Sequence, residues 1–530
     1  PVLILIIHFC VGIVDNLIIH MESYFEEMEV DYINKFLTGL TINKTSKLEM
    51  SYFDEKKNYD IIQKVNTEST QRLINILSMT MNFVRNFVTL VGIVSVLLLL
   101  NGWIIIFCLM ISVPSALISY KMSKKQYKIF NSRIEDLRKI TEIKNILVNY
   151  ENVKELKIYR LGKFFEEYAT KLCDKFICQN KIVKKKYVMD VNLSETLQIA
   201  VLYLLKFYVV IQVVYKKMSI GDLSLFINAI DNFHNCISSM FKSIIKLYEN
   251  GLYIKDLNDF LRLPVQKSKT GLKFNNKFKI IEFSHVYFKY GPNEPYILED
   301  INLTIERGKS YAFVGINGAG KTTIVKLLLN LYRPSSGRIT IDGVDINKFA
   351  VEEYWKNIGA VFQEFIQYPF DVNHNIGFGC VEKGFDSECI KDAAKKSGAY
   401  EFVSKLKNGF ETNLKKGWEE STQLSLGQWQ KIAISRVFME DFPILVLDEP
   451  TASVDARTEY ELYNKIKMLI NDRTCILISH RLSTVKLVNT IFVLENHCLV
   501  EKGTHEELMK KNKVYASLYN MQAEAYEDNL

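Results

Sequence analysis

Residues 315–322 read Gly-Ile-Asn-Gly-Ala-Gly-Lys-Thr, a glycine-rich stretch that ends in a lysine and a hydroxyl residue. Such a stretch is typical of a loop that wraps around phosphate groups, because glycine lets backbone N–H groups approach the oxygens without a Cβ in the way. An apolar run, Ser310–Val314, precedes the loop, and another, Thr323–Leu331, follows it. This order predicts a strand, the loop and a helix, so the sequence indicates an α/β nucleotide-binding domain rather than a chance glycine turn.

Individual residues of this loop have expected roles in holding a nucleotide. Lys321 is expected to reach the β- and γ-phosphates, and the hydroxyl of Thr322 is expected to ligate Mg²⁺. The helix that follows adds its positive N-terminal end. The other predicted nucleotide ligands of this segment are Gly315, Asn317, Gly318, Gly320 and Thr323.

A later apolar run, Ile444–Leu447, is suited to a buried parallel strand and ends in two acids. The end of this strand would deliver Asp448 to Mg²⁺ and place Glu449 where it can orient and deprotonate an attacking water. An apolar strand that ends in two acids occurs in many proteins, so this assignment depends on the motifs around it.

The order of the glycine loop, a Leu-Ser-Leu-Gly-Gln segment and the acidic strand end resembles the ATP-binding-cassette (ABC) family, whose cassettes hydrolyse ATP in pairs. The resemblance is close over 272–510. It implies that Gln363 senses Mg²⁺ and water, that His480 contacts the γ-phosphate and that Asp455 communicates across a cassette dimer. Tyr290 stands where the family stacks an aromatic ring on adenine. The predicted catalytic residues are therefore Glu449, His480 and Gln363, and the predicted Mg²⁺ ligands are Thr322, Gln363 and Asp448.

The Leu-Ser-Leu-Gly-Gln segment departs from the family pattern at Leu426, where the family usually has glycine. The resemblance implies that Ser425, Gly427 and Gln428 bind the γ-phosphate of a nucleotide held by a second cassette, so the working unit is a dimer. The Leu426 side chain either hinders this approach or points away from the helix start. We favour the second option and a homodimer, with a heterodimer as the alternative. The continuation Gln-Trp-Gln-Lys-Ile-Ala resembles exporters of bacterial peptides, including lantibiotic transporters.

Apolar stretches long enough to suggest membrane spans fill the first half of the chain. They are Val2–Ile19, Phe87–Leu100, Trp103–Ser119, Leu197–Val214 and Leu223–Ile245, with Asn101-Gly102 as the turn between the second and third. A cassette that uses ATP lies in the cytosol, so five spans would put residue 1 on the other side. We therefore expect that a first span and whatever precedes it are missing from this sequence.

The long charged segments between the spans resemble the cytoplasmic helical extensions of ABC exporters. By position, Ser51–Asp54 and Val153–Arg160 match the short coupling helices at their ends. The predicted fold class is an all-α transmembrane domain of the exporter type followed by an α/β P-loop ATPase. The predicted domains are 1–250 (transmembrane), 251–271 (linker) and 272–530 (cassette). Strand-type runs, Lys279–Phe283 and Val286–Tyr290, open the cassette.

Polar residues at helical spacing occur within the last apolar stretch. They are Asn228, Asp231, Asn232, Asn235, Ser238, Ser239 and Lys242. Lipid disfavours such a stripe, so it is expected to face other helices or a water-filled cavity. Lys206, in the preceding span, is either a further pathway residue or a side chain that snorkels to the membrane interface.

Composition excludes several other classes of function. Nine cysteines are present without a C-x-x-C pair or a His/Cys cluster, so neither a zinc site nor a disulfide framework is implied. The net charge of +7 is modest, and many lysines flank the apolar runs, which fits the positive-inside rule better than a nucleic-acid surface. These lysines are Lys121, Lys124, Lys125, Lys128, Lys181, Lys184, Lys185 and Lys186.

The sequence favours an ATP-driven exporter in the cytoplasmic membrane, with ATP and Mg²⁺ as cofactors and a second half-transporter chain as partner. We expect the substrate to be a peptide, with a lipid or a hydrophobic drug as the alternative. A membrane-anchored cassette ATPase without transport activity is the competing class, but a simple anchor needs neither the polar stripe nor the long cytoplasmic extensions. A soluble DNA-repair-type cassette ATPase explains none of the apolar runs.

Overall fold

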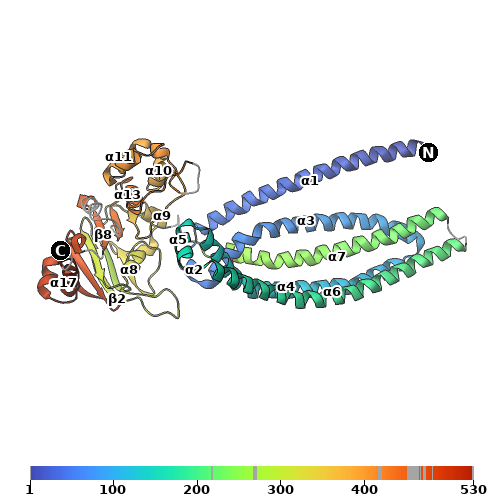
Figure 1. Cartoon of the computed structure of the whole chain (residues 1–530), viewed down its shortest axis with the longest axis horizontal. Helices are drawn as coiled ribbons and strands as arrows, with labels where there is room; N and C mark the ends of the chain where they lie inside the picture. Colours follow the sequence, from blue (N-terminus) through green and yellow to red (C-terminus); the bar gives the residue numbers. More distant parts are fainter. Residues whose placement is uncertain are drawn as a thin grey trace. The chain divides into compact units, whose positions relative to one another are not determined.

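The computed structural model describes residues 2–215, 219–266, 271–415, 420–449, 465, 467–468, 473–479 and 482–527. Its contacts divide the chain into two compact units, both drawn in Figure 1. The helical unit comprises Pro1–Ser46 and Lys56–Leu263, and the cassette unit comprises Lys47–Glu55 and Pro264–Leu530. A short stretch between two helices of the helical unit therefore belongs to the cassette unit.

Long helices build the helical unit. They are α1 (Val2–Thr45), α3 (Lys56–Leu100), α4 (Trp103–Val148), α6 (Gly162–Val214) and α7 (Ile220–Arg262), with the short α5 (Tyr150–Ile158) between α4 and α6. Helix α3 packs along α7, and α4 packs against α6 and α7; these helices run side by side in Figure 1. Buried apolar side chains from α3, α4, α6 and α7, including Leu97, Cys108, Val209 and Phe233, form a shared core.

Among the residues that the structure describes, four helical segments are long and apolar enough to cross a membrane: Val2–Thr45, Gln71–Leu100, Trp103–Val148 and Gly162–Val214. We expected a fifth span in Leu223–Ile245, within α7, but α7 is not among these segments. The physical reason is its polar stripe, whose amides and charges lower the mean hydropathy of a helix that is otherwise apolar. The expected fold class, a helical membrane domain followed by an α/β cassette, is confirmed.

Both ends of α7 follow from local chemistry. Its first turn is closed by a capping box, in which the Ser219 hydroxyl accepts a hydrogen bond from the Asp222 backbone N–H, and the Asp222 carboxylate accepts one from that of Ser219. At the other end, α7 continues to Arg262 and stops before Pro264. Residues 251–262, which we assigned to a linker, are thus helical, because buried Leu257 and Phe260 continue the apolar face.

Two sheets form the cassette unit. The central sheet has the order β10-β9-β3-β8-β7-β6, and its pairings are parallel except that β10 runs antiparallel to β9. The second sheet is antiparallel with the order β2-β1-β4-β5. The strands are β1 (Ile280–Phe288), β2 (Leu298–Glu306), β3 (Ser310–Gly315), β4 (Ser336–Ile341), β5 (Val344–Asp345), β6 (Ile358–Val361), β7 (Ile444–Asp448), β8 (Thr474–Ile478), β9 (Thr490–Glu495) and β10 (Cys498–Gly503).

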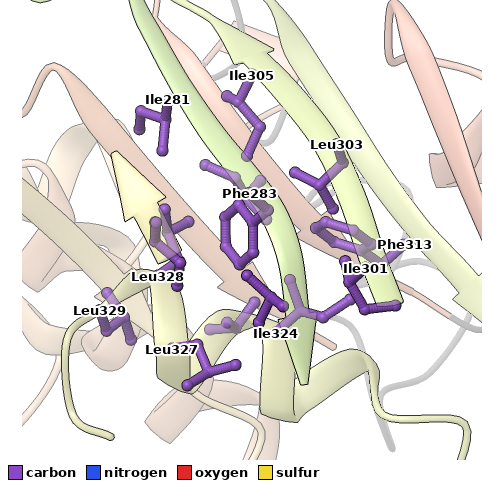
Figure 2. Close-up of a cluster of buried hydrophobic side chains, with 14 of the residues drawn as sticks. Ile281, Phe283, Ile301, Leu303, Ile305, Phe313, Ile324, Leu327, Leu328 and Leu329 are labelled. Atoms are coloured by element: carbon purple, nitrogen blue, oxygen red, sulfur yellow. The ribbon is translucent and has the colours of Figure 1, made fainter. Parts of the chain in front are cut away.

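The main core of the cassette lies between these sheets and around helix α8 (Lys321–Leu328). Figure 2 shows side chains of β1 and β2, such as Phe283 and Leu303, converging with Phe313 of β3 and Ile324 of α8. The two runs that we expected as separate strands join into β1, with a bulge where His285 adopts a positive φ of 48°. This core holds the end of β3 and the start of α8 together.

A group of helices with its own core follows β6. It includes α10 (Val372–Gly377), α11 (Ser387–Ser397), α12 (Tyr400–Val403) and α13 (Leu426–Val437), and Trp429 is among its buried side chains. The remaining elements are α2 (Ser51–Asp54), α9 (Val351–Trp355), α15 (Leu482–Val485), α16 (His505–Lys511), α17 (Val514–Glu527), η1 (Ile346–Lys348), η2 (Val381–Lys383) and η3 (Gly409–Glu411).

Candidate nucleotide-hydrolysis site

The glycine loop connects β3 to α8, as its sequence predicts. Gly320 caps α8 with a positive φ of 98°, and a Cβ at this position would lie 2.5 Å from Leu298 Cδ2 and 2.8 Å from the Ile297 carbonyl oxygen. At Gly315 a Cβ would lie 2.3 Å from the Leu494 carbonyl oxygen on β9. Both glycines are therefore required by the backbone itself, quite apart from any ligand.

Lys321, the first residue of α8, is buried, with 6% of its surface exposed. Its Nζ donates hydrogen bonds to the carbonyl oxygens of Gly315 (2.8 Å) and Ile316 (2.9 Å). Burial lowers the pKa of this ammonium, while the nearby Glu449 and Asp448 carboxylates raise it. The loop thus contains a desolvated cation, and desolvation strengthens its attraction to phosphate.

Asp448 ends strand β7, which lies between β8 and β6 in the central sheet, and is 3% exposed. Burial, together with the charge of Glu449, raises the pKa of this carboxyl to about 6, although Lys321 and Lys326 act in the opposite direction. Among the residues that the structure describes, Asp448 Oδ1 has no hydrogen-bond partner. A buried oxygen of this kind is suited to a cation.

Glu449 follows directly and has a left-handed backbone, with φ of 47°. This conformation costs a non-glycine residue about 1–2 kcal/mol, so the surrounding structure must stabilise it. The backbone N–H of Glu449 donates to the Ile478 carbonyl oxygen at 2.9 Å, and its Oε2 accepts a hydrogen bond from Gln363 Nε2 at 2.9 Å. The predicted base and the predicted sensor glutamine are therefore in direct contact.

The donor set fits a hard divalent cation. Asp448 offers the unpartnered carboxylate oxygen, and Thr322, exposed and adjacent to Lys321, offers a hydroxyl. Gln363 offers an amide oxygen, because its nitrogen is the atom that donates to Glu449. Oxygen ligands of these three kinds are those that Mg²⁺ takes in phosphate-binding proteins. These residues could hold Mg²⁺ together with phosphate oxygens.

Tyr290 lies next to the loop and is half-buried. Its hydroxyl is 3.2 Å from Thr323 Oγ1, and its ring makes edge-to-face contacts with Phe288 and Tyr332 at centroid distances of 4.9 and 5.3 Å. Lys326 Nζ lies 5.1 Å from the ring centroid. The aromatic residue predicted to stack on adenine is thus beside the loop, in contact with the helix that the loop begins.

The Leu-Ser-Leu-Gly-Gln segment forms the N-terminus of α13. Ser425 is the N-cap, and a capping box joins it to Gln428, with a Gln428 N–H to Ser425 Oγ distance of 3.3 Å and a Ser425 N–H to Gln428 Oε1 distance of 2.9 Å. Leu426 is the first helical residue and is 48% exposed. Its side chain therefore points outward rather than into the cassette core. Gly427 is half-buried in the same turn.

The structure brings together the glycine loop, Asp448, Glu449 and Gln363 within one cassette, whereas the α13 N-terminus is a separate element. The predicted residues Asp455 and His480 lie outside the described residues. Asn317 and Gly318 lie in the glycine loop, where Gly318 has a φ of 83°.

Contacts of Glu49 and of α2 with the rest of the cassette unit had no signal in the sequence beyond their position. The Tyr332 hydroxyl donates a 2.6 Å hydrogen bond to Asp54 Oδ2, and Arg333 pairs with Glu49 at 2.9 Å. Burial and the Asp54 carboxylate raise the pKa of Tyr332. The Tyr332 ring also contacts the Tyr290 ring, which lies beside the glycine loop. These two tyrosines therefore connect α2 to the loop.

The polar stripe of α7 is also visible in the helical unit. Asn228, Asn232 and Asn235 are exposed. Asp231 is half-buried and forms an ion pair with Lys206 on α6, with an Nζ–Oδ1 distance of 2.7 Å. Lys206 therefore pairs with Asp231 within the helix bundle, and its role as a pathway residue or a snorkelling side chain stays a prediction. A paired charge between two helices is the form in which membranes tolerate ionised side chains.

A phosphate-binding loop and an acidic strand end in one cassette, joined to a bundle of apolar helices, define a membrane-bound nucleoside triphosphatase. Comparison with known proteins narrows this class. The ABC transporter family model matches residues 298–452. The nisin transport ATP-binding protein NisT of Lactococcus lactis subsp. lactis is 30% identical over 541 residues, which cover 99% of this chain and 88% of NisT. The chain therefore belongs to the ABC transporter family.

Other similar proteins agree with this assignment. The subtilin transport ATP-binding protein SpaT of Bacillus subtilis is 29% identical over 94% of this chain and 83% of SpaT, and the ATP-dependent lipid A-core flippase of Legionella pneumophila (strain Lens) is 28% identical over 96% of this chain and 85% of the flippase. A bacterial Atm1-family ABC exporter with ATP bound has the same fold, with a TM-score of 0.80 at 21% identity over 94% of this chain and 86% of that chain.

The chain has the helical unit and the cassette of an exporter-type half-transporter. It lies in the cell membrane as a multi-pass protein with its ATPase domain in the cytosol, and it couples ATP hydrolysis to export.

Proposed function

We propose that this chain forms a homodimer that exports a peptide. The observation that carries the substrate class is the exposed polar face of α7, formed by Asn228, Asn232 and Asn235. Amide side chains on a membrane helix need water, a polar ligand or another polar helix, and a peptide substrate supplies many hydrogen-bonding groups. The names of two relatives, which specify nisin and subtilin transport, support the same substrate class.

Export of a lipid is the second candidate, and the similarity to lipid A-core flippases favours it. A hydrophobic drug is a further alternative, because putative multidrug exporters of Staphylococcus aureus are 39% identical over the 242 residues that cover 46% of this chain. That match covers less than half of this chain, so it supports the drug assignment less than the full-length relatives support theirs.

For hydrolysis, we assign the general base to Glu449 and its orientation to Gln363, which donates a hydrogen bond to it. Lys321 neutralises phosphate charge, and Mg²⁺, held by Thr322, Asp448 and Gln363, supplies further charge neutralisation when bound. Glycine-loop N–H groups and Thr323 complete the phosphate cradle, and Tyr290 supports adenine. The base abstracts a proton from the attacking water as the water oxygen bonds to the γ-phosphorus, and the bond from this phosphorus to the β,γ-bridging oxygen breaks, so that inorganic phosphate and ADP leave.

In the dimer, the α13 N-terminus of one chain would face the nucleotide held by the other, with Ser425, Gly427 and Gln428 toward the γ-phosphate. His480 and Asp455 would act at the same composite site. The 48% exposure of Leu426 supports a tolerated substitution, since a side chain that points outward leaves the backbone N–H groups at the helix start available.

We expect the tagged chain, purified alone in detergent, to hydrolyse ATP with two equivalent sites, and Leu426→Gly to change the rate less than about threefold. The reason is that Leu426 is outside the cassette core and its backbone remains that of a helix start. Measuring bound nucleotide per chain and phosphate release tests both parts. A lone chain that is inactive until a second cassette subunit is added would establish the heterodimer instead.

Transport itself can be measured in inside-out membrane vesicles that contain the chain. We expect ATP-dependent accumulation of fluorescein-labelled nisin, with a labelled polar decapeptide as a second probe and a fluorescent phospholipid analogue as the lipid arm. Vesicles that contain the inactive Glu449→Gln chain serve as the control for ATP-driven uptake. Accumulation of the phospholipid analogue without either peptide would overturn the peptide assignment and support the lipid.

A further inference from the structure

A cavity of about 260 Å³ lies inside the helical unit, between α4, α6 and α7. These helices run side by side in Figure 1. Its walls include Ser112 and Ser115 from α4, Glu195 from α6, and Asn235 and Lys242 from α7. We name it the α4–α6–α7 cavity. Ser112 and Ser115 belong to Trp103–Val148, a segment apolar enough to cross a membrane, so a polar cavity here is unusual for a structural core.

The back wall of this cavity is a buried polar network. Gln198 is 4% exposed and donates a 2.8 Å hydrogen bond from Nε2 to Ser115 Oγ, while Ser112 is 1% exposed and its Oγ lies 3.5 Å from His234 Nδ1. Burying these groups in an apolar bundle has a cost that hydrogen bonds offset, because Gln198 is bonded to Ser115 and the Ser112 hydroxyl also donates to the Cys108 carbonyl oxygen at 2.9 Å. Polar side chains therefore stand beside the cavity at buried positions where a leucine would need no hydrogen-bond partner.

Two charged side chains of opposite sign line the cavity from different helices. Glu195 comes from α6 and Lys242 from α7, and both are exposed. Within the described ranges neither makes a hydrogen bond or an ion pair, although both lie close enough to His234 to influence it electrostatically. By contrast, Lys206 and Asp231, on the same two helices, are paired directly. The cavity thus offers one carboxylate and one ammonium to a ligand.

We propose that the α4–α6–α7 cavity binds a short polar segment of the exported peptide, a proposal that rests on the peptide-export function. A peptide segment has backbone groups that both donate and accept hydrogen bonds, and it can carry charges of both signs to meet Glu195 and Lys242. An acyl chain or an aromatic drug would leave these groups unpaired. Since sites for drug-sized ligands have about 300–1,000 Å³, the cavity holds part of the substrate, and the rest extends along the Asn228–Asn235 face of α7.

The test uses the full chain in phosphatidylglycerol vesicles and measures how synthetic decapeptides stimulate ATP hydrolysis. The decapeptides carry both charges, only acidic, only basic or only apolar side chains. For the decapeptide with both charges, Glu195→Gln and Lys242→Gln should each raise the half-maximal concentration about tenfold, as expected when a charge-assisted hydrogen bond is lost. Asn235→Leu, an exposed position, should also weaken stimulation by filling the cavity with apolar atoms.

Matched controls lie on the same helices. Asp190→Asn on α6 and Lys246→Gln on α7 remove like charges from exposed positions that do not line the cavity, so both should keep the unsubstituted half-maximal concentration. Thermal unfolding midpoints within a few degrees of the parent chain would show that the cavity variants fold.

The outcomes separate this inference from the proposed function. If decapeptides stimulate the parent chain but the cavity variants keep its half-maximal concentration, the cavity assignment fails and peptide export stands. If no decapeptide stimulates the parent chain, peptide export fails and the cavity assignment with it. Stimulation by phosphatidylethanolamine in the vesicles, lost in the Glu195→Gln/Lys242→Gln double variant, would reassign the cavity to a zwitterionic lipid headgroup.

Discussion

Glu449→Gln should lower the rate of ATP hydrolysis about 10²–10⁴-fold while ATP binding is retained. The amide cannot accept the proton of the attacking water, but its oxygen can still accept the hydrogen bond that Gln363 donates to Glu449 at 2.9 Å. The substitution therefore removes the proposed base and leaves the local hydrogen bond in place. Phosphate release by the purified chain and equilibrium binding of ATP measure the two effects separately.

Retained binding without turnover has a structural consequence. Two cassettes that hold ATP between them should stay closed, so the variant is expected to accumulate a nucleotide-bound dimer that can be isolated by gel filtration. Glu401→Gln, an exposed acid on α12, provides the control and should hydrolyse ATP at the parent rate. Hydrolysis by Glu449→Gln within about tenfold of the parent chain would assign the base to another residue.

The parts of the site that could be predicted from sequence are those set by local chain order. The glycine loop must join β3 to α8 because its residues are contiguous, and Asp448 must stand at the end of β7 because the apolar run stops there. Parallel pairing of β7 with β8, and of β8 with β3, then puts both strand ends at one edge of the sheet. The order of the motifs along the chain was therefore enough to predict where the glycine loop and Asp448 lie.

Other features depend on contacts between distant segments, and no local pattern encodes them. The left-handed backbone of Glu449 is stabilised by its hydrogen bond to Ile478, and the Asp54–Tyr332 contact joins residues 278 positions apart. A tyrosine after a helix and an aspartate at the end of a short helix each occur in many proteins, so neither predicts this contact. Only the packed cassette unit makes them partners.

In the membrane part, hydropathy predicted the spans that are continuously apolar and failed at α7, where polar residues interrupt the pattern. The pairing of Lys206 with Asp231 depends on the register of α6 against α7, which is set by helix packing. For the same reason, the α4–α6–α7 cavity could not be located from the sequence, although most of its polar residues are visible there.

Lys321→Ala should weaken ATP binding itself, raising the Kd by about 10–150-fold, since hydrogen bonds to charged groups contribute about 1.5–3 kcal/mol each. Lys321 Nζ now donates to the Gly315 and Ile316 carbonyl oxygens, so it lies within the loop that wraps the phosphates. Because the side chain is 6% exposed, its removal takes away a desolvated charge that bulk water does not replace. At ATP concentrations below the Kd, the rate of hydrolysis should decrease by the same factor as the affinity for ATP.

Two comparisons isolate this effect from damage to the fold. Lys321→Met keeps an apolar stem in the buried position and should show the same loss of affinity with a smaller change in thermal stability. Lys309→Met removes an exposed lysine just before β3 and should bind ATP as the parent chain does. A double variant tests the two proposed roles together. If Lys321 acts in binding and Glu449 in turnover, adding Lys321→Ala to Glu449→Gln should release the nucleotide that the single variant retains. A double variant that still holds ATP as tightly as Glu449→Gln would exclude Lys321 from the phosphate cradle.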